Sequence, residues 1–157
     1  MKHNIKFLIL DVDGTMTDGG IYITEEGHQF KKFSAKDGLG IKIAMKSGID
    51  VGIISHSYST EMVSKRANML GMKYVYIGQQ PKLQILEEWL TELDLQLNEI
   101  AYIGDDLNDL DIMEKVGFKA CPSDATETIK QICDVVLTNK GGEGAVREFI
   151  DKHLLGK

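Results

Sequence analysis

Short apolar runs alternate with amphipathic segments along nearly the whole chain. The apolar runs, rich in β-branched residues, predict strands at 6–12, 51–55, 73–78, 100–105, 118–122 and 134–138. Between them, apolar residues recur with helical spacing, which predicts helices at 39–46, 60–70, 82–93, 107–116, 127–132 and 145–154. Glycines at the ends of several of these segments are typical helix stops.

Continuous apolar strands joined by helices are typical of a parallel sheet that is covered on both faces. The pattern therefore predicts an α/β fold of three layers, Rossmann-like, with a central parallel sheet. We expect one domain over residues 1–157, since the chain is 157 residues long and 43% hydrophobic. In sheets of this kind, ligands bind at the carboxyl ends of the strands.

Residues 19–34 interrupt the alternation of strands and helices. Ile21 and Ile23 follow the two-residue period of a strand, a Glu-Glu-Gly turn comes next, and Phe30 and Phe33 continue on the other side. This order predicts a β-hairpin inserted after the first strand.

The charge balance excludes some classes of partner. A net charge of -6 disfavours nucleic acid and anionic membranes as main partners, because both attract basic surfaces. No apolar run approaches the roughly 20 residues of a membrane span, and the first residues lack the apolar core of a signal peptide. We therefore expect a protein of the cytoplasm.

Acidic residues follow two of the predicted strands. Asp11 and Asp13 end the first strand in "LILDVDGTMTD", and Asp105 and Asp106 end the fourth in "YIGDDLNDLD". Parallel strands bring these carboxylates to one edge, where they repel one another unless a hard cation lies among them. The pattern predicts a Mg²⁺ site with Asp11, Asp13 and Asp105 as ligands and Asp106 as a further ligand or a support.

Two further residues at the same edge complete a phosphate site. With a cation present, a phosphate can approach Asp11, while Ser55 and Lys82 orient its other oxygens. Asp11 is then the candidate nucleophile, and Asp13 is the candidate that protonates the leaving oxygen and later deprotonates water. Asp109 is expected to hold Lys82 in place.

These segments resemble the four ordered motifs of the haloacid dehalogenase superfamily of phosphotransferases. The resemblance rests on "DVDGT" at 11–15, Ser55 after "VGII", Lys82, and "GDDLND" at 104–109. It implies Mg²⁺-dependent phosphate transfer through an aspartyl phosphate. Members often carry a cap domain near the first motifs, and this chain has no room for one.

Two longer segments resemble the capless branch whose type members are 3-deoxy-D-manno-octulosonate 8-phosphate phosphatases. They are "DGGIYITEEGHQFKKFSAKDGLGIKI" and "GGEGAVREFI". This resemblance implies a sugar-acid phosphate as substrate, in the synthesis of surface polysaccharide such as lipopolysaccharide. It also implies a homotetramer that the hairpins assemble, in which a neighbouring subunit covers each active site.

Such substrates carry a carboxylate far from the phosphate, so cations are expected at the rim of the site. The candidates are Lys32, Lys36, Arg66 and Arg147, although a lysine or arginine on a helix is often simply solvated. Each of the four could therefore bind the substrate carboxylate or simply be solvated.

The loop after Ser55 departs from the octulosonate-type pattern. Those relatives typically continue with glycine and arginine, whereas this chain reads "SHSYSTEM", with His56 and Ser57 in these places. Phosphatases for nine-carbon sugar acids (nonulosonate 9-phosphates of the 2-keto-3-deoxynononate or sialic acid type) also lack that arginine, so they are an alternative. His56 could contact the substrate or be plain solvated loop.

An alternative of another class is a noncatalytic oligomerisation module, because a similar domain is attached to some sialic acid cytidylyltransferases. The complete set of Asp11, Asp13, Lys82 and Asp105 argues against it. A scaffold alone has no use for four separated chemical groups that meet at one edge.

Overall fold

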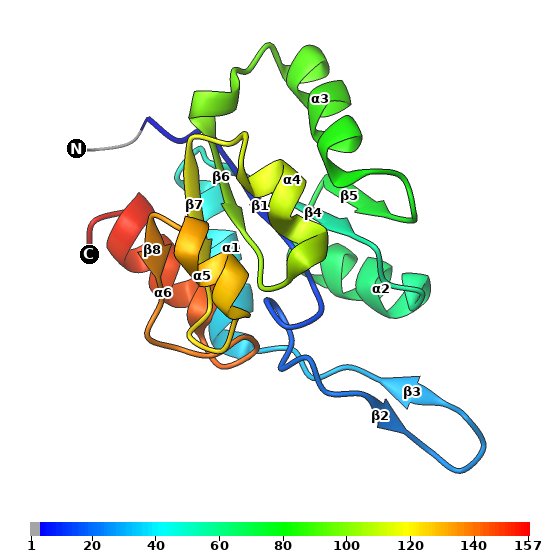
Figure 1. Ribbon diagram of the computed structural model, residues 1–157. Helices are drawn as coiled ribbons and strands as arrows, with labels where there is room; N and C mark the ends of the chain where they lie inside the picture. Colours follow the sequence, from blue (N-terminus) through cyan, green and yellow to red (C-terminus); the bar gives the residue numbers. More distant parts are fainter. Residues whose placement is uncertain (1–3) are drawn as a thin grey trace.

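A six-stranded parallel sheet forms the centre of the computed structural model, which describes residues 4–157 (Figure 1). Its order is β5-β4-β1-β6-β7-β8. The strands are β1 Phe7–Leu10, β4 Asp50–Ser55, β5 Tyr74–Ile77, β6 Ile100–Ile103, β7 Phe118–Cys121 and β8 Val135–Val136. All five pairings are parallel, which confirms the predicted Rossmann-like fold.

Helices cover both faces of the sheet. They are α1 Ala35–Lys46, α2 Thr60–Leu70, α3 Lys82–Leu93, α4 Leu110–Met113, α5 Glu127–Ile132 and α6 Ala145–Phe149, with 3₁₀ turns η1 Leu97–Glu99 and η2 Leu107–Asp109 and a π-helical turn η3 Ile150–Leu154. Buried residues of α1, α2 and α6 join one core, and those of α3, α4 and α5 join the other. None of the helices within residues 4–157 has the length and apolar character needed to cross a membrane.

Strand β1 lies between these two cores. Leu8 and Leu10 are buried on one face, and Phe7 and Ile9 are buried on the other. This double burial explains why the strand reads as a continuous apolar run rather than an alternating one.

Helix α1 begins earlier than the sequence predicted. It starts at Ala35 rather than Leu39, and the Ser34 hydroxyl caps it by accepting a hydrogen bond from an amide of the first turn. Gly38 and Gly40 lowered the predicted helix propensity there. A Cβ atom at Gly40 would lie 2.8 Å from Cδ of Arg147, so this glycine allows α6 to pack closely.

Two other helices are shorter than expected. The segment predicted as one helix over 107–116 forms η2 followed by the single turn of α4. The last predicted helix, 145–154, is α-helical only to Phe149 and continues as η3.

The predicted hairpin is present but its strands are short. β2 Tyr22–Ile23 pairs with β3 Gln29–Phe30 in antiparallel fashion, and an isolated bridge joins Thr17 to Phe33 at its base. Figure 1 shows the hairpin projecting well away from the sheet and its helices. The Tyr22 and Phe30 rings stack on each other, with their centroids 4.9 Å apart.

Apolar side chains of the hairpin face solvent. Ile21, Ile23 and Phe30 are 80%, 60% and 56% exposed. Phe33, the fourth apolar residue of the predicted hairpin, instead packs against the core and lies under the guanidinium of Arg66. Phe33 therefore belongs to the base of the hairpin, where the chain rejoins the body.

Glu148 on α6 holds the segment that follows β8. Its carboxylate accepts hydrogen bonds from the amides of Thr138 (3.0 Å) and Asn139 (2.9 Å) and from the ammonium of Lys152 (3.0 Å). Burial disfavours the charged carboxylate, but these donors outweigh burial and lower the pKa of Glu148 from its ordinary 4.5 to about 2.

We predict that Glu148→Gln destabilises the protein by up to about 3 kcal/mol at pH 7, from about 1.4 kcal/mol for each unit of pKa shift. Because the folded pKa lies below the unfolded one, this stabilisation is present above pH 4.5 and is lost as the pH falls toward 2. Urea unfolding of the two proteins between pH 7 and pH 3 tests this. The exposed Glu127→Gln is the control, and a difference for Glu148→Gln that stays constant with pH would contradict the prediction.

Candidate active site

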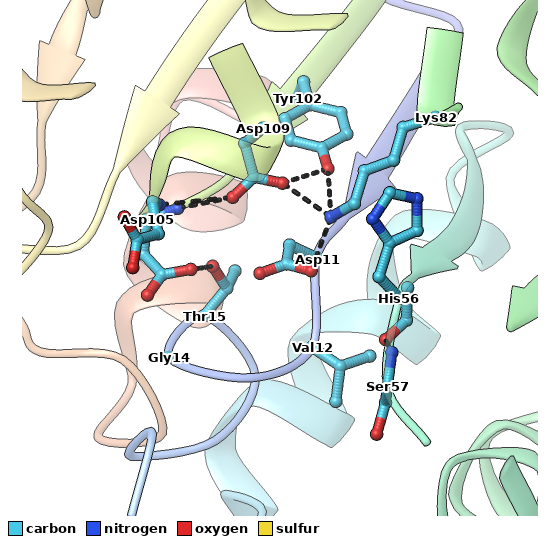
Figure 2. Close-up of polar contacts among 12 residues, drawn as sticks. Asp11, Val12, Gly14, Thr15, His56, Ser57, Lys82, Tyr102, Asp105 and Asp109 are labelled. Atoms are coloured by element: carbon cyan, nitrogen blue, oxygen red, sulfur yellow. Dashed lines mark hydrogen bonds and ion pairs between the residues drawn. The ribbon is translucent and has the colours of Figure 1, made fainter. Parts of the chain in front are cut away.

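The ammonium of Lys82 lies at the centre of a buried polar cluster at the carboxyl edge of the sheet. Its Nζ donates to Oδ1 of Asp11 and to Oδ1 of Asp109, both at 2.7 Å, and it lies 3.2 Å from the hydroxyl of Tyr102 (Figure 2). Asp11 directly follows β1, Lys82 opens α3, Tyr102 lies on β6 and Asp109 ends η2. The parallel topology thus brings together residues that are distant in sequence.

Asp109 is fixed by donors on both carboxylate oxygens. Besides Lys82, the Tyr102 hydroxyl donates to Oδ1 at 2.6 Å, and the amides of Asp105 and Asp106 donate to Oδ2 at 2.9 and 3.3 Å. Asp109 therefore holds Lys82, as the sequence predicted. Both oxygens already have partners, so Asp109 is poorly suited to hold a metal as well.

Tyr102 was not singled out from the sequence. It is fully buried within the apolar run "IAYIG", and a buried tyrosine hydroxyl requires a hydrogen-bond partner. Tyr102 lies on the strand that ends at the acidic motif. Its need for a partner there was the sequence signal that could have identified it.

The carboxylates are arranged to hold a cation. Oxygens of Asp11, Asp105 and Asp109 lie within 4.8 Å of one another. Burial, followed by repulsion from Asp109, raises the pKa of Asp11 to about 6, although Lys82 opposes this. Burial and the nearby Asp11 charge raise the pKa of Asp105 to about 9.

Such a group of buried acids is stable in its charged form only with added positive charge, and its oxygen donors suit Mg²⁺. Asp11 and Asp105 are the residues that would hold the ion, since Asp109 is occupied by its donors. The Thr15 hydroxyl donates to Oδ1 of Asp105 at 3.4 Å and orients that side chain. These residues fit the Mg²⁺ cofactor that the sequence predicted.

Asp13 lies at the mouth of the site rather than within this group. Its side chain is 48% exposed, and Oδ1 accepts a hydrogen bond from Nζ of Lys31 at 2.6 Å. Its places as metal ligand and as acid–base residue stay predictions. Lys31, from the base of the hairpin, is a residue that the sequence analysis missed, because the hairpin's return to the site could not be read from local pattern.

Ser55, His56 and Ser57 form the opposite wall of the site. They line a cavity of about 390 Å³ together with Asp11, Asp13, Asp105, Asp106, Leu107 and Asn108. The buried Ser55 hydroxyl accepts a hydrogen bond from the amide of Ser57 at 3.0 Å, which fixes the turn that follows β4. Nε2 of His56 lies 2.8 Å from the carbonyl of Gln80, so this ring is held by the loop before α3.

Asp106 has a local structural role in addition to its place on the cavity wall. It precedes η2, and its Oδ1 accepts the amide of Leu107 at 2.7 Å. A function as a further metal ligand stays a prediction.

Two of the four candidate rim cations are committed to other contacts. Nζ of Lys32 pairs with Glu143 at 3.0 Å. Arg66 donates to the carbonyl of Ser34 at 3.2 Å and covers the Phe33 ring, and neither residue lines the cavity. The structure therefore gives these two residues positions at the base of the hairpin.

The other two candidates lie near the start of α6. The Arg147 side chain donates to Asp151 at 2.7 Å, and its amide donates to the buried Asp37 at 2.9 Å. Lys36 is exposed, and its carbonyl lies 3.5 Å from the Arg147 guanidinium. Like Lys32 and Arg66, neither lines the cavity in this chain.

Comparison with known proteins agrees with this geometry. The model of the haloacid dehalogenase-like hydrolases matches residues 53–150, which include Ser55, Lys82 and the acidic motif of Asp105. The chain belongs to this family. Within this family, the chain is similar over nearly its whole length to the KdsC phosphatases.

The relatives carry the names of sugar-acid phosphatases. The chain is 42% identical to 3-deoxy-D-manno-octulosonate 8-phosphate phosphatase KdsC of Yersinia pestis, over 98% of this chain and 82% of that protein. KdsC of Escherichia coli K12 is 41% identical, with 98% and 81% covered. A crystal structure of the phosphatase from Moraxella catarrhalis, in complex with magnesium, phosphate and KDO, superposes with a TM-score of 0.93 at 37% identity, over 99% and 89% of the two chains.

We predict that Tyr102→Phe lowers kcat by roughly tenfold or more while KM stays within about threefold. The substitution removes the hydroxyl that donates to Asp109, and a hydrogen bond to a charged group contributes about 1.5–3 kcal/mol. Steady-state kinetics with any phosphate monoester that the enzyme accepts measures this. Tyr76→Phe, which removes a hydroxyl that accepts an amide outside the cluster, is the control. Equal kcat in both variants would show that Tyr102 does not position Lys82 and Asp109.

Proposed function

We propose that this phosphatase hydrolyses 3-deoxy-D-manno-octulosonate 8-phosphate to the free sugar acid and phosphate. The observation that carries the proposal is the buried cluster of Asp11, Lys82 and Asp109 beside a cavity that also presents Ser55 and Asp105. The names of the relatives supply the substrate. The cytoplasmic location and the role in polysaccharide synthesis that were expected from the sequence stay predictions.

The proposed reaction has two steps. An oxygen of Asp11 attacks phosphorus as the bond from phosphorus to the sugar oxygen breaks, and Asp13 gives a proton to that oxygen. Asp13 then removes a proton from a water molecule, which attacks phosphorus and breaks its bond to Asp11, so that phosphate is released. Ser55 and Lys82 hold the other phosphate oxygens. Bound Mg²⁺ supplies positive charge that reduces the repulsion between the carboxylates and the phosphate.

The distal part of the sugar acid has room beside the hairpin. A second cavity shares Asp13, His56 and Ser57 with the first, and it is lined further by Lys31 and by exposed apolar residues of the hairpin. Lys31 is the cation that this cavity offers to a carboxylate. We infer that it contributes to substrate binding in place of Lys32, which lines neither cavity.

A nine-carbon sugar acid phosphate is the second candidate substrate. The observation that favours it is the loop at 56–59, which holds His56 and Tyr58 at the second cavity in place of an arginine. Tyr58 lines this cavity and is itself 89% exposed. A longer chain would extend toward it.

We predict that the wild-type enzyme hydrolyses both eight- and nine-carbon 3-deoxy-ulosonate phosphates, measured as kcat/KM. EDTA should abolish turnover and added Mg²⁺ should restore it. Asp11→Asn should show none, because an amide does not attack phosphorus at a useful rate. Steady-state turnover by Asp11→Asn would contradict the covalent mechanism, and a lack of activity on both substrates would contradict the proposed function.

We also propose that the protein assembles as a homotetramer in which a neighbour covers each active site. An uncapped site needs a cover to exclude bulk water during phosphate transfer. The exposed apolar side chains of the hairpin at Ile21, Ile23 and Phe30 are the surface that such a neighbour would bury.

We predict a particle of about four chains by light scattering, each chain having a mass of 17.5 kDa. Ile23→Asp should dissociate it and lower kcat/KM on the sugar acid phosphates, because a charge replaces an apolar contact. Met69→Asp alters an apolar side chain of similar exposure on α2 and is the control. An active wild-type monomer would contradict the shared cover.

A further inference from the structure

Residues 138–144, here called the glycine loop, lie directly against the loop that carries Asp11 and Asp13. The amide of Gly142 donates to the carbonyl of Thr15 at 3.2 Å. Figure 1 shows this orange segment, which follows β8, beside the blue segment that follows β1. The contact is between two backbones, without side chains between them.

At Gly141 this contact leaves no room for a side chain. A Cβ atom there would lie 1.9 Å from the carbonyl oxygen of Gly14 and 2.9 Å from that of Thr17. The backbone of Gly141 does not lie in the left-handed region, so an alanine would be unstrained apart from this collision.

Gly14 cannot easily move out of the way. Its Cα faces the Asp105 carboxylate, because a Cβ built on Gly14 would lie 2.0 Å from Oδ2 of Asp105. Gly14 therefore lies between Gly141 on one side and the carboxylate of Asp105 on the other. Any displacement of Gly14 changes the distance between the Asp11 loop and Asp105.

The glycine loop is itself held by carboxylates from separate parts of the chain. Oδ1 of Asp124 accepts the amide of Gly141 at 3.0 Å, and Glu148 accepts the amides of Thr138 and Asn139. Asp37 accepts an amide at the start of α6, immediately after the loop. These contacts anchor the loop at both of its ends and at Gly141.

The turn that anchors Gly141 also touches Asp105. The amide of Thr126 donates to the carbonyl of Asp105 at 2.9 Å, and the amide of Ser123 donates to Asn139 at 3.0 Å. The residues around Asp124 thus connect to both sides of the acid cluster. Gly14 and Asp105 are positioned by one continuous set of contacts.

We propose that Gly141 is a positioning residue for the phosphatase site. By lacking a side chain, it allows the glycine loop to set the place of Gly14, and so the separation between Asp11 and Asp105 that Mg²⁺ binding requires. Its part in turnover rests on the proposed function, whereas its part in Mg²⁺ binding can be measured without a substrate.

The test compares Gly141→Ala with Gly144→Ala in the full chain. Gly144 belongs to the same loop, and an alanine there is strained because φ is 96°, but its Cβ meets nothing closer than 3.4 Å. The pair therefore separates collision with the catalytic loop from general damage to the glycine loop. The readouts are the Kd for Mg²⁺ by calorimetry without substrate, kcat on the octulosonate phosphate and on an aryl phosphate, and Tm.

For Gly141→Ala we expect the Kd for Mg²⁺ to rise about tenfold and kcat to fall about 100-fold on both substrates, from a misplacement of the order of 1 Å. Gly144→Ala should lower Tm, with Kd for Mg²⁺ and kcat within about threefold of wild type. Wild-type Mg²⁺ affinity in Gly141→Ala would overturn the proposal. Equal losses in the two variants would overturn it too, because they would indicate destabilisation alone.

If Gly141→Ala does not fold, the Mg²⁺ affinity of Asp124→Ala tests the proposal instead. It removes the anchor of the Gly141 amide without adding an atom, and a rise in the Kd for Mg²⁺ of about threefold or more supports the proposal. An unchanged Kd overturns it. A wild-type enzyme without sugar-acid phosphatase activity would contradict the proposed function, while the Mg²⁺ measurements would still decide the role of Gly141.

Discussion

The structure of the active site depends on one buried ammonium that is shared by two carboxylates. Burial alone lowers the pKa of Lys82, but the charges of Asp11 and Asp109 outweigh it and raise the pKa above its ordinary value. Burial disfavours the charged form of Asp11, which Lys82 opposes, and Lys82 in turn keeps its charge through Asp11 and Asp109. The three side chains are therefore a unit, and one negative charge remains after pairing. Together with Asp105, that excess gives the site its affinity for a divalent cation.

The order of the strands in the sheet explains how Lys82, Asp11 and Asp109 come together. β1 lies between β4 and β6, so the residues that follow these three strands occupy one continuous edge. The first residue of α3 reaches the same edge because α3 covers β1 and β4, and its side chain has only to extend past Tyr102. Asp109 then closes the arrangement through η2, where its carboxylate caps the turn and accepts the amide of Asp105. The sheet topology thus brings these residues to one edge, and the hydrogen bonds to Asp109 hold them in fixed positions.

Sequence reasoning worked where periodic pattern and topology determine position. The parallel sheet and the convergence of Asp11, Ser55, Lys82 and Asp105 follow from where apolar runs end, since parallel strands end at a common edge. It did not work where position depends on tertiary contact. Lys31 reaches Asp13 because Phe33, two residues on, packs against the core and brings the returning strand of the hairpin to the site, and α1 tolerates Gly38 and Gly40 because Arg66 and Arg147 pack closely against them. Local patterns contain neither fact.

The rim cations show why residue type alone could not identify the substrate contacts. Lys32, Arg66 and Arg147 each have a partner within the chain, and these partners fix the base of the hairpin and the start of α6. A cation that already neutralises a carboxylate or packs on a ring must lose that contact before it binds a substrate, which reduces the net gain. Lys31 differs because its partner Asp13 lines the site itself, so under the proposed function a substrate that engages Asp13 would leave Lys31 free to bind the sugar acid. Under the proposed function and assembly, the hairpin would contribute to recognition through its base, and its exposed apolar side chains would be left for contact with another subunit.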